Sequence, residues 1–234
     1  MTTEILPLRG TAPGTTQTLA VRRFGVPGAR PKIYVQAALH ADETPGLLVA
    51  QHLLRRLQAH SDAGRIVGEV VVVPLANPVG LSQRMLGSLL GRFDLASGTN
   101  FNRGFADLAS RAAQAVAGKL TGDPAANEAL IRAALLHANA RSGVATPDEH
   151  LKRTLLGLAL DADLVLDLHC ENEGVMHLYT LTPLADRCRP WAALLGAQAV
   201  LLAPESGGQP FDEACSRPWL ELRDRFPGHP VPLA

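Results

Sequence analysis

IYVQAALHADETPG, residues 33–46, joins an apolar run to a helix start through a short polar segment. The apolar run, Ile33 to Leu39, is typical of a buried strand, and it delivers His40 to the carboxyl end of that strand. Thr44-Pro45-Gly46 then opens an apolar-periodic helix that we expect to reach His60. This order predicts an open α/β sheet whose polar side chains gather where the strands end.

A second apolar run ends in the same way. Residues 163–168, Asp-Leu-Val-Leu-Asp-Leu, read as another buried strand, and His169 follows directly. A single histidine is more often a surface or hydrogen-bonded core residue. Because ligand sites in open α/β sheets lie beyond the carboxyl ends of the strands, we expect His40, Glu43 and His169 to converge. Two imidazoles and a carboxylate leave a fourth position for water around zinc, which predicts one Zn²⁺ per chain in a catalytic site.

The composition describes a globular chain without a strong overall charge. The 22 Lys and Arg balance the 22 Asp and Glu, so no field of the whole molecule attracts nucleic acid or an anionic membrane. The chain begins without the basic and apolar regions of a signal peptide, and no later segment is apolar enough to span a membrane. Three widely spaced cysteines fit free thiols in a reducing compartment. We expect a cytoplasmic protein that binds a small molecule, and its oligomeric state stays unknown.

Apolar runs alternate with helical patterns along the whole chain, which predicts one domain over residues 1–234. The strands are expected at residues 16–24, 33–39, 69–75, 163–168, 175–181 and 199–203. The helices are expected at residues 44–60, 106–120, 124–141, from 146 onward, 183–196 and 211–226. We expect the first two strands to pair as a hairpin through residues 25–31. Residues 227–234 read as a loop entering a new strand, so we expect a C-terminally truncated domain.

Between the predicted strands lie two segments that carry turn signals. Asn77-Pro78-Val79-Gly80 predicts a turn. Residues 85–101 form a Gly-rich stretch without a clear period, the kind of loop that carries binding residues on a rigid scaffold. It leads directly into Asn102-Arg103.

Four of these motifs occur in the order seen in the succinylglutamate desuccinylase/aspartoacylase family, a branch of the zinc carboxypeptidase-like hydrolases. They are His40-Ala41-Asp42-Glu43, Asn77-Pro78-Val79-Gly80, Asn102-Arg103 and Asp167-Leu168-His169. The resemblance implies an α/β fold with a mixed central sheet covered by helices on both faces, here without the C-terminal β domain of many members. It also implies a zinc-dependent hydrolase that cleaves the amide bond of N-acylated amino acids or similar small carboxylates. The zinc ligands that it implies are His40, Glu43 and His169.

The resemblance also implies substrate-binding residues. Asn102 and Arg103 would hold the carboxylate of the substrate, and a guanidinium suits this role because it can clamp a carboxylate through two parallel hydrogen bonds. The family uses an arginine upstream of this pair to stabilise the oxyanion of the reacting carbonyl. Arg92 is our choice for that catalytic role over Arg84.

The sequence departs from the family first at Asn100, where many relatives have an Asp that orients a ligand histidine. An amide oxygen can accept the imidazole N–H, but it raises the basicity of the ring less than a carboxylate does. Asp167 lies two residues before His169 on the same strand face, so it is placed to support that ring instead.

The second departure concerns the general base. The family's glutamate lies in a strand downstream, close to or beyond Ala234. Glu171, Glu173 and Glu205 are the nearby candidates, and none matches the family position. Two alternatives therefore stay open: a metallocarboxypeptidase acting on short peptides, and an inactive metal-binding module that lacks its general base.

Overall fold

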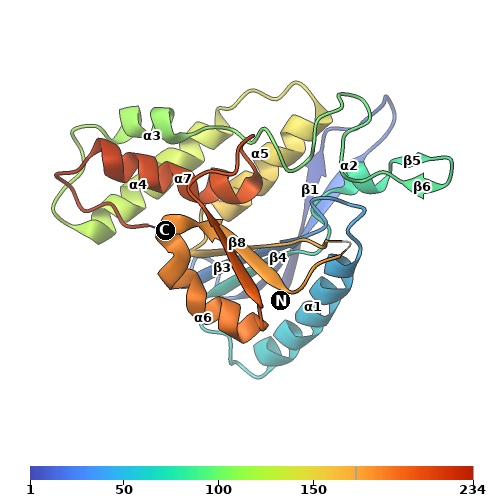
Figure 1. Cartoon of the computed structure of the whole chain (residues 1–234), viewed down its shortest axis with the longest axis horizontal. Helices are drawn as coiled ribbons and strands as arrows, with labels where there is room; N and C mark the ends of the chain where they lie inside the picture. The colour runs from blue at the N-terminus through green and yellow to red at the C-terminus, as the bar shows by residue number, and fades with distance from the viewer. Residues whose placement is uncertain (172, 234) are drawn as a thin grey trace.

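The computed structural model describes residues 1–171 and 173–233. It has the mixed central sheet, with helices on both faces, that the sequence predicts (Figure 1). The sheet has five strands in the spatial order β1 (Thr2–Leu8), β2 (Gln17–Gly25), β4 (Glu69–Val73), β3 (Lys32–Ala37) and β7 (Leu164–Leu168). β4, β3 and β7 run parallel, whereas β1 and β2 run antiparallel to their neighbours.

The predicted hairpin between the strands at residues 16–24 and 33–39 is wrong. β4 lies between β2 and β3, and it pairs antiparallel with β2 and parallel with β3. β3 thus gains a parallel neighbour on each edge, and its residues are almost all buried. The structure also contains β1, an edge strand that the sequence prediction missed; Pro7 is tolerated there because an edge strand needs fewer backbone donors.

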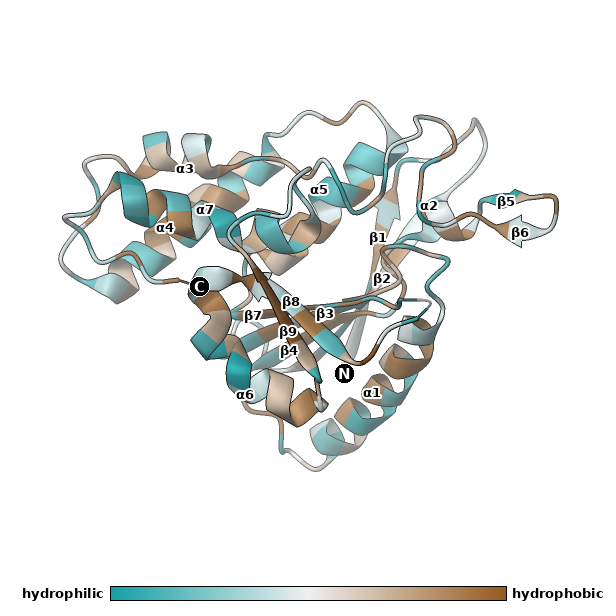
Figure 2. Ribbon diagram, in the orientation of Figure 1, coloured by the Kyte–Doolittle hydropathy of each residue, from teal (hydrophilic) through white to brown (hydrophobic). Residues whose placement is uncertain are grey.

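Helices cover the two faces of the sheet. On one face, α1 (Pro45–Asp62) packs Leu53, Leu54 and Leu57 against apolar side chains of the strands. The other face carries the larger core under α5 (Pro147–Ala159) and α7 (Phe211–Arg225), with α3 (Ala109–Val116) and α4 (Pro124–Ala140) packed beside them. Figure 2 shows the apolar strands between these layers. The inner strands β3 and β4 are therefore buried between two apolar layers, whereas the edge strand β1 is largely exposed.

Smaller elements flank this body. The turn predicted at residues 77–80 is instead the start of a short helix, α2 (Pro78–Leu81), whose first turn is capped by the Asn77 side chain. It is followed by a small hairpin of β5 (Arg84–Met85) and β6 (Ser88–Leu89), which projects from the body in Figure 1.

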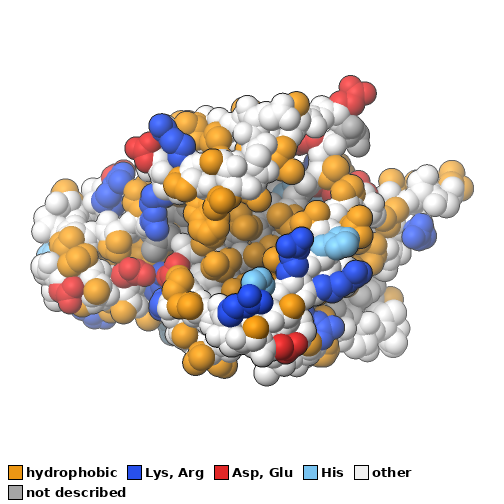
Figure 3. Space-filling view, turned by 90° about the horizontal axis from the view of Figure 1, so that it is seen from below, with side chains coloured by type: hydrophobic (Ala, Val, Ile, Leu, Met, Phe, Trp, Pro, Cys, Tyr) orange, Lys and Arg blue, Asp and Glu red, His pale blue; other side chains and the backbone are white. Residues whose placement is uncertain are grey.

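The last part of the chain adds a second, two-stranded parallel sheet of β8 (His177–Leu181) and β9 (Ala199–Ala203). The short 3-10 helix Thr182–Leu184 and α6 (Ala185–Leu195) connect the two strands. Both strands expose apolar side chains, including Tyr179 and Leu202. Seen from below, the molecule is hollowed and hydrophobic side chains surround the hollow (Figure 3). Within the described residues, no helix combines the length and the apolarity needed to cross a membrane.

Candidate metal and catalytic site

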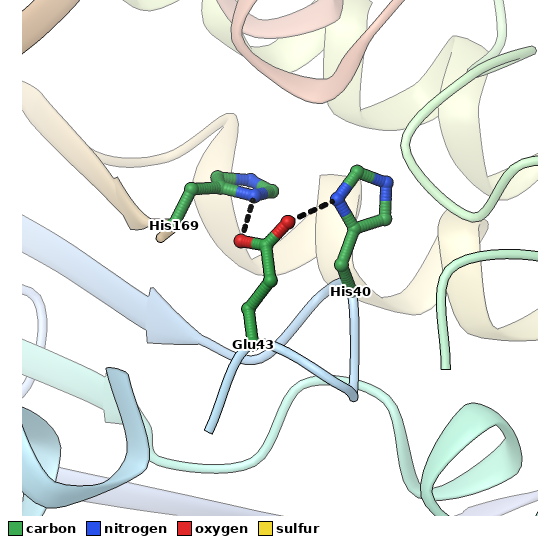
Figure 4. A group of neighbouring side chains, drawn as sticks. All are labelled: His40, Glu43 and His169. Carbon is green, nitrogen blue, oxygen red and sulfur yellow. Dashed lines mark hydrogen bonds and ion pairs between the residues drawn. The ribbon is translucent and has the colours of Figure 1, made fainter. Parts of the chain in front are cut away.

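His40, Glu43 and His169 meet at the carboxyl edge of the sheet (Figure 4). Ala37 of β3 is paired with Leu168 of β7, so the residues that follow these two strands emerge side by side. The two imidazole rings lie nearly perpendicular, with their centroids 5.1 Å apart. One ligand atom from each of the three side chains lies within 4.8 Å of the other two. The structure thus brings the three predicted ligands together, and their binding of zinc stays a prediction.

Hydrogen bonds with two other segments of the chain hold the loop that carries His40 and Glu43 in place. The amide of Asn77 donates to the carbonyl of Leu39 over 2.8 Å. On the other side, the carbonyl of Gly91 accepts from the Ala41 N–H over 3.0 Å. A Cβ on Gly91 would lie only 2.3 Å from the amide nitrogen of Asp42, so the close approach requires glycine. The sequence predicts a turn and a family motif at Asn77 but not its contact with this loop, and no local sequence signal indicates the role of Gly91.

Each imidazole of the site faces an oxygen at both of its ring nitrogens. Nδ1 of His40 lies 2.9 Å from one carboxylate oxygen of Glu43, and Nδ1 of His169 lies 3.0 Å from the other. On the far side of the rings, Nε2 of His40 lies 2.8 Å from Asn100 Oδ1. Nε2 of His169 lies 2.9 Å from Asp167 Oδ2. A neutral imidazole has one N–H, so each ring needs either a second proton or a cation at Nδ1.

The pKa shifts of His169 and Glu43 likewise favour a positive charge at this site. Burial disfavours the charged form of His169, but Asp167 and Glu43 outweigh burial and raise its pKa to about 10. Burial would also raise the pKa of Glu43. Hydrogen bonds from His169, from His40 and from the Cys170 N–H, which lies 2.7 Å away, instead hold that pKa well below its usual range. Glu43 is therefore an anion.

A divalent cation fits this donor set. It would take the place of the protons on the two Nδ1 atoms and would be shared with the Glu43 carboxylate, while Asn100 and Asp167 keep the far sides of the rings occupied. Two imidazole nitrogens and a carboxylate are a ligand set that zinc takes in three-ligand sites.

Arg92, the predicted oxyanion-stabilising residue, lies at the edge of this cluster. Its Nη2 donates to Glu43 Oε1 over 2.9 Å, and 43% of its side chain is exposed. Its carbonyl accepts from the Phe101 N–H, which ties it to the segment that follows. The rejected alternative, Arg84, lies on the projecting hairpin. Arg92 is thus near the predicted metal ligands and open to solvent, and its catalytic role stays a prediction.

Asn102 and Arg103 lie on the turn that begins at Asn100. The Asn102 N–H donates to Asn100 Oδ1, and its own Oδ1 accepts from the N–H of Phe211, the first residue of α7. Asn102 therefore has a structural contact that the sequence did not predict. Arg103 is exposed, and its stem packs so closely on Gly208 that a Cβ there would lie 2.7 Å from Arg103 Cδ.

The three glutamates considered as general bases are exposed. Glu205 forms an ion pair with Arg217 of α7 over 3.2 Å. Glu171 follows Cys170 in the loop after β7, and Glu173 lies beyond residue 172, which is outside the described residues. Within the described chain, these contacts assign no general base.

Comparison with known proteins agrees with the fold and the motifs. Residues 29–217 match the family model of the succinylglutamate desuccinylase/aspartoacylase catalytic domain. A family member of this name from Shewanella amazonensis is 31% identical, with a TM-score of 0.86 over 100% of this chain and 63% of its own. One from Shewanella frigidimarina is 26% identical, with a TM-score of 0.80 over 97% of this chain and 60% of its own.

A more distant structure, an aspartoacylase family protein from Mesorhizobium loti, shares the fold at 16% identity and a TM-score of 0.56 over 92% of this chain and 56% of its own. No curated protein sequence matches the chain. The chain spans less than two thirds of the length of these structural relatives. The extent of the family match shows that the chain belongs to the succinylglutamate desuccinylase/aspartoacylase family.

Proposed function

We propose that this chain is a zinc-dependent hydrolase domain that cleaves the amide bond of N-acylated amino acids or similar small carboxylates. The observation that carries the proposal is the position of the Glu43 carboxylate between the Nδ1 atoms of His40 and His169. Membership in the family supports the same conclusion. Zinc held by three protein ligands would act as a Lewis acid, lowering the pKa of water and polarising a carbonyl oxygen.

The chain's own residues would hold and orient the reacting groups. Asn100 and Asp167 fix the two imidazoles through their outer nitrogens, so that both Nδ1 atoms point to the same place. Arg92 sets a guanidinium beside them, where a carbonyl oxygen that gains negative charge would be stabilised. Arg103 would clamp the carboxylate of the substrate, with Asn102 beside it.

The charge of the site also fits an anionic substrate. Arg92 and Arg103 are both open to solvent next to elements that position the cluster. The whole chain is neutral, so these local cations determine which small molecules are attracted. A metallocarboxypeptidase would use the same metal and the same carboxylate clamp, so the substrates must separate the two activities.

The test is turnover of N-acetyl and N-succinyl amino acids, and of unacylated dipeptides, by the zinc-loaded protein. His40→Ala/His169→Ala serves as the site variant. Hydrolysis of acyl amino acids that the double variant loses would support the proposal, whereas hydrolysis of dipeptides alone would favour the carboxypeptidase. Stoichiometric zinc without turnover of either class would favour an inactive metal-binding module. Failure to bind zinc would contradict the proposal.

A further inference from the structure

A buried ion pair lies under the turn that begins at Asn100. Lys152 and Asp148 are one helical turn apart on α5, and each is only 5% exposed. The Lys152 ammonium lies 2.8 Å from Asp148 Oδ2 and 3.4 Å from the backbone carbonyl oxygen of Asn100. It also sits over the Phe105 ring, 6.0 Å from its centroid. The ammonium thus joins α5 to the segment that borders His40, Glu43 and His169.

Asn100 uses both of its oxygens to hold the site together. Its backbone carbonyl accepts from the Arg103 N–H over 3.1 Å, in addition to its contact with Lys152. Its side-chain oxygen accepts from the Asn102 N–H and lies 2.8 Å from Nε2 of His40. The residue that Lys152 touches is therefore the one that orients His40 and that starts the turn carrying Asn102 and Arg103.

Stability alone does not explain why a charged pair is buried here. Removing two charges from water is costly, and replacing such a pair by apolar residues of the same volume often leaves a protein as stable or makes it more stable. α5 already contributes Leu151, Leu155 and Leu156 to the core, so an apolar pair would extend an existing apolar face. A charged group does have one property that an apolar one lacks: it can fix a carbonyl oxygen at a defined place.

We propose that Lys152, itself held by Asp148, is a positioning residue for the metal site. Its ammonium fixes the backbone of Asn100, so that Asn100 Oδ1 stays on Nε2 of His40 and Nδ1 of that ring stays directed at Glu43. Without the ammonium, the turn gains freedom, the imidazole of His40 loses its fixed orientation and metal binding weakens. The inference rests on the proposed metal site.

The first experiment is a double-mutant cycle read out as zinc affinity, measured by competition with a chromophoric chelator. Lys152→Met removes the ammonium and keeps a stem of similar length; we expect about tenfold weaker binding, at the low end of the range for partners that orient a metal-binding histidine. Asn100→Ala should weaken binding at least as much. In the Asn100→Ala background, Lys152→Met should have almost no further effect on zinc affinity: the backbone carbonyl that Lys152 contacts remains, but the Oδ1 atom through which Asn100 orients His40 is gone.

The control is Lys32→Met, which removes another buried lysine with two carboxylate partners at the opposite end of the sheet. We expect it to lower stability and to leave zinc affinity unchanged. Equal zinc affinity of Lys152→Met and wild type would overturn the proposal, as would an undiminished effect of Lys152→Met in the Asn100→Ala background. If Lys152→Met does not fold, Asp148→Asn, which keeps the side-chain shape, takes its place in the same cycle.

A second readout does not depend on zinc. In the metal-free protein, Lys152→Met should speed hydrogen exchange of the Asn102 and Arg103 amides, which donate to Asn100, and Lys32→Met should not. Unchanged exchange at this turn would overturn the positioning role. A wild-type protein that binds no zinc would contradict the metal site itself, and the exchange measurement would then still decide the role of Lys152.

Discussion

The parallel strands β4, β3 and β7 carry charged groups at both of their ends, but the two ends are balanced differently. At the amino end, the Lys32 ammonium is buried 3.1 Å from Glu69 and 2.6 Å from Asp161. Glu69 has a second cation, Arg23, at 3.0 Å. Asp163, just before β7, is paired with Arg30 and Arg132. Each of these carboxylates has a permanently charged partner.

At the carboxyl end, the partners of the carboxylates are mainly imidazoles. Glu43 lies between His40 and His169, and Asp167 holds the far side of His169. Arg92 is the permanent cation beside Glu43, and it is half-exposed. An imidazole carries charge only when protonated, and its Nδ1 can lose a proton to solvent and bind a metal instead, which a guanidinium does not do. One end of the sheet is thus a structural ion network, and the other is suited to bind a cation.

The largest expected effect comes from removing His169, the proposed zinc ligand at one end of β7. His169→Ala should weaken zinc binding more than about 100-fold, since loss of an orienting partner alone costs roughly 10–100-fold. Asp163→Ala, at the other end of the same strand, should lower the free energy of unfolding and leave zinc affinity unchanged. Chelator competition and urea unfolding of both variants measure the contrast. A His169→Ala variant that keeps wild-type zinc affinity would contradict this contrast between the two ends of β7.

The next effect concerns Asp167, whose carboxylate contacts Nε2 of His169. Asp167→Asn keeps the shape of the side chain but loses the carboxylate that accepts from Nε2, so we expect zinc affinity to fall by about tenfold or more. The comparison variant is Asp161→Asn at the amino end, which should leave zinc affinity as it is. If both variants bind zinc like wild type, Asp167 does not support the metal site.

A smaller effect should follow from Arg103→Lys. The charge is kept but the two-pronged clamp is lost, so an N-acetyl amino acid should bind about tenfold more weakly, given about 1.5 kcal/mol for a hydrogen bond to a charged group. Calorimetric titration measures it, and Arg84→Lys on the projecting hairpin is the control. Equal affinities in wild type and Arg103→Lys would place Arg103 outside the binding site.

The smallest effect is a pH dependence at the amino end. Burial would raise the pKa of Glu69, but hydrogen bonds from the Gly28 N–H, Lys32 and Arg23 lower it below its ordinary value of 4.5. Its contribution to stability is therefore complete above pH 4.5 and is lost as the pH falls through the lowered pKa. Urea unfolding below pH 4.5 should show a shallower loss for Glu69→Gln than for wild type. Parallel curves would mean that Glu69 does not titrate in this network.

The parts of the molecule that the sequence predicted well are those with local signals. The apolar runs before His40 and His169 define β3 and β7, and their parallel pairing then follows from an α/β order of elements. The helix predicted from residue 146 onward likewise matches the start of α5, where Thr146 and Glu149 have the spacing of a capping box and form one. Convergence of the site residues follows from these strands, because both end at the same edge of the sheet.

The rest depends on contacts between distant segments. No local pattern says that β4 enters between β2 and β3, so the predicted hairpin failed. The helical pattern alone indicates nothing special about Lys152; only the fold shows that its ammonium contacts the turn at Asn100. Gly91 likewise matters only because the backbone at Asp42 approaches it. Such contacts join residues from 37 positions apart, for Lys32 and Glu69, to 52 positions apart, for Asn100 and Lys152, beyond the reach of periodicity and capping rules.

A crystal structure of the zinc-loaded protein, with anomalous data collected at the zinc absorption edge, would locate the metal directly. We predict one strong peak at the carboxyl end of β3 and β7, about 2.0–2.2 Å from Nδ1 of His40, Nδ1 of His169 and a carboxylate oxygen of Glu43. We also expect Asn100 and Asp167 to keep their contacts with the outer nitrogens of the two rings. A strong peak elsewhere, or stoichiometric zinc that leaves these three side chains without metal, would contradict the proposed zinc site.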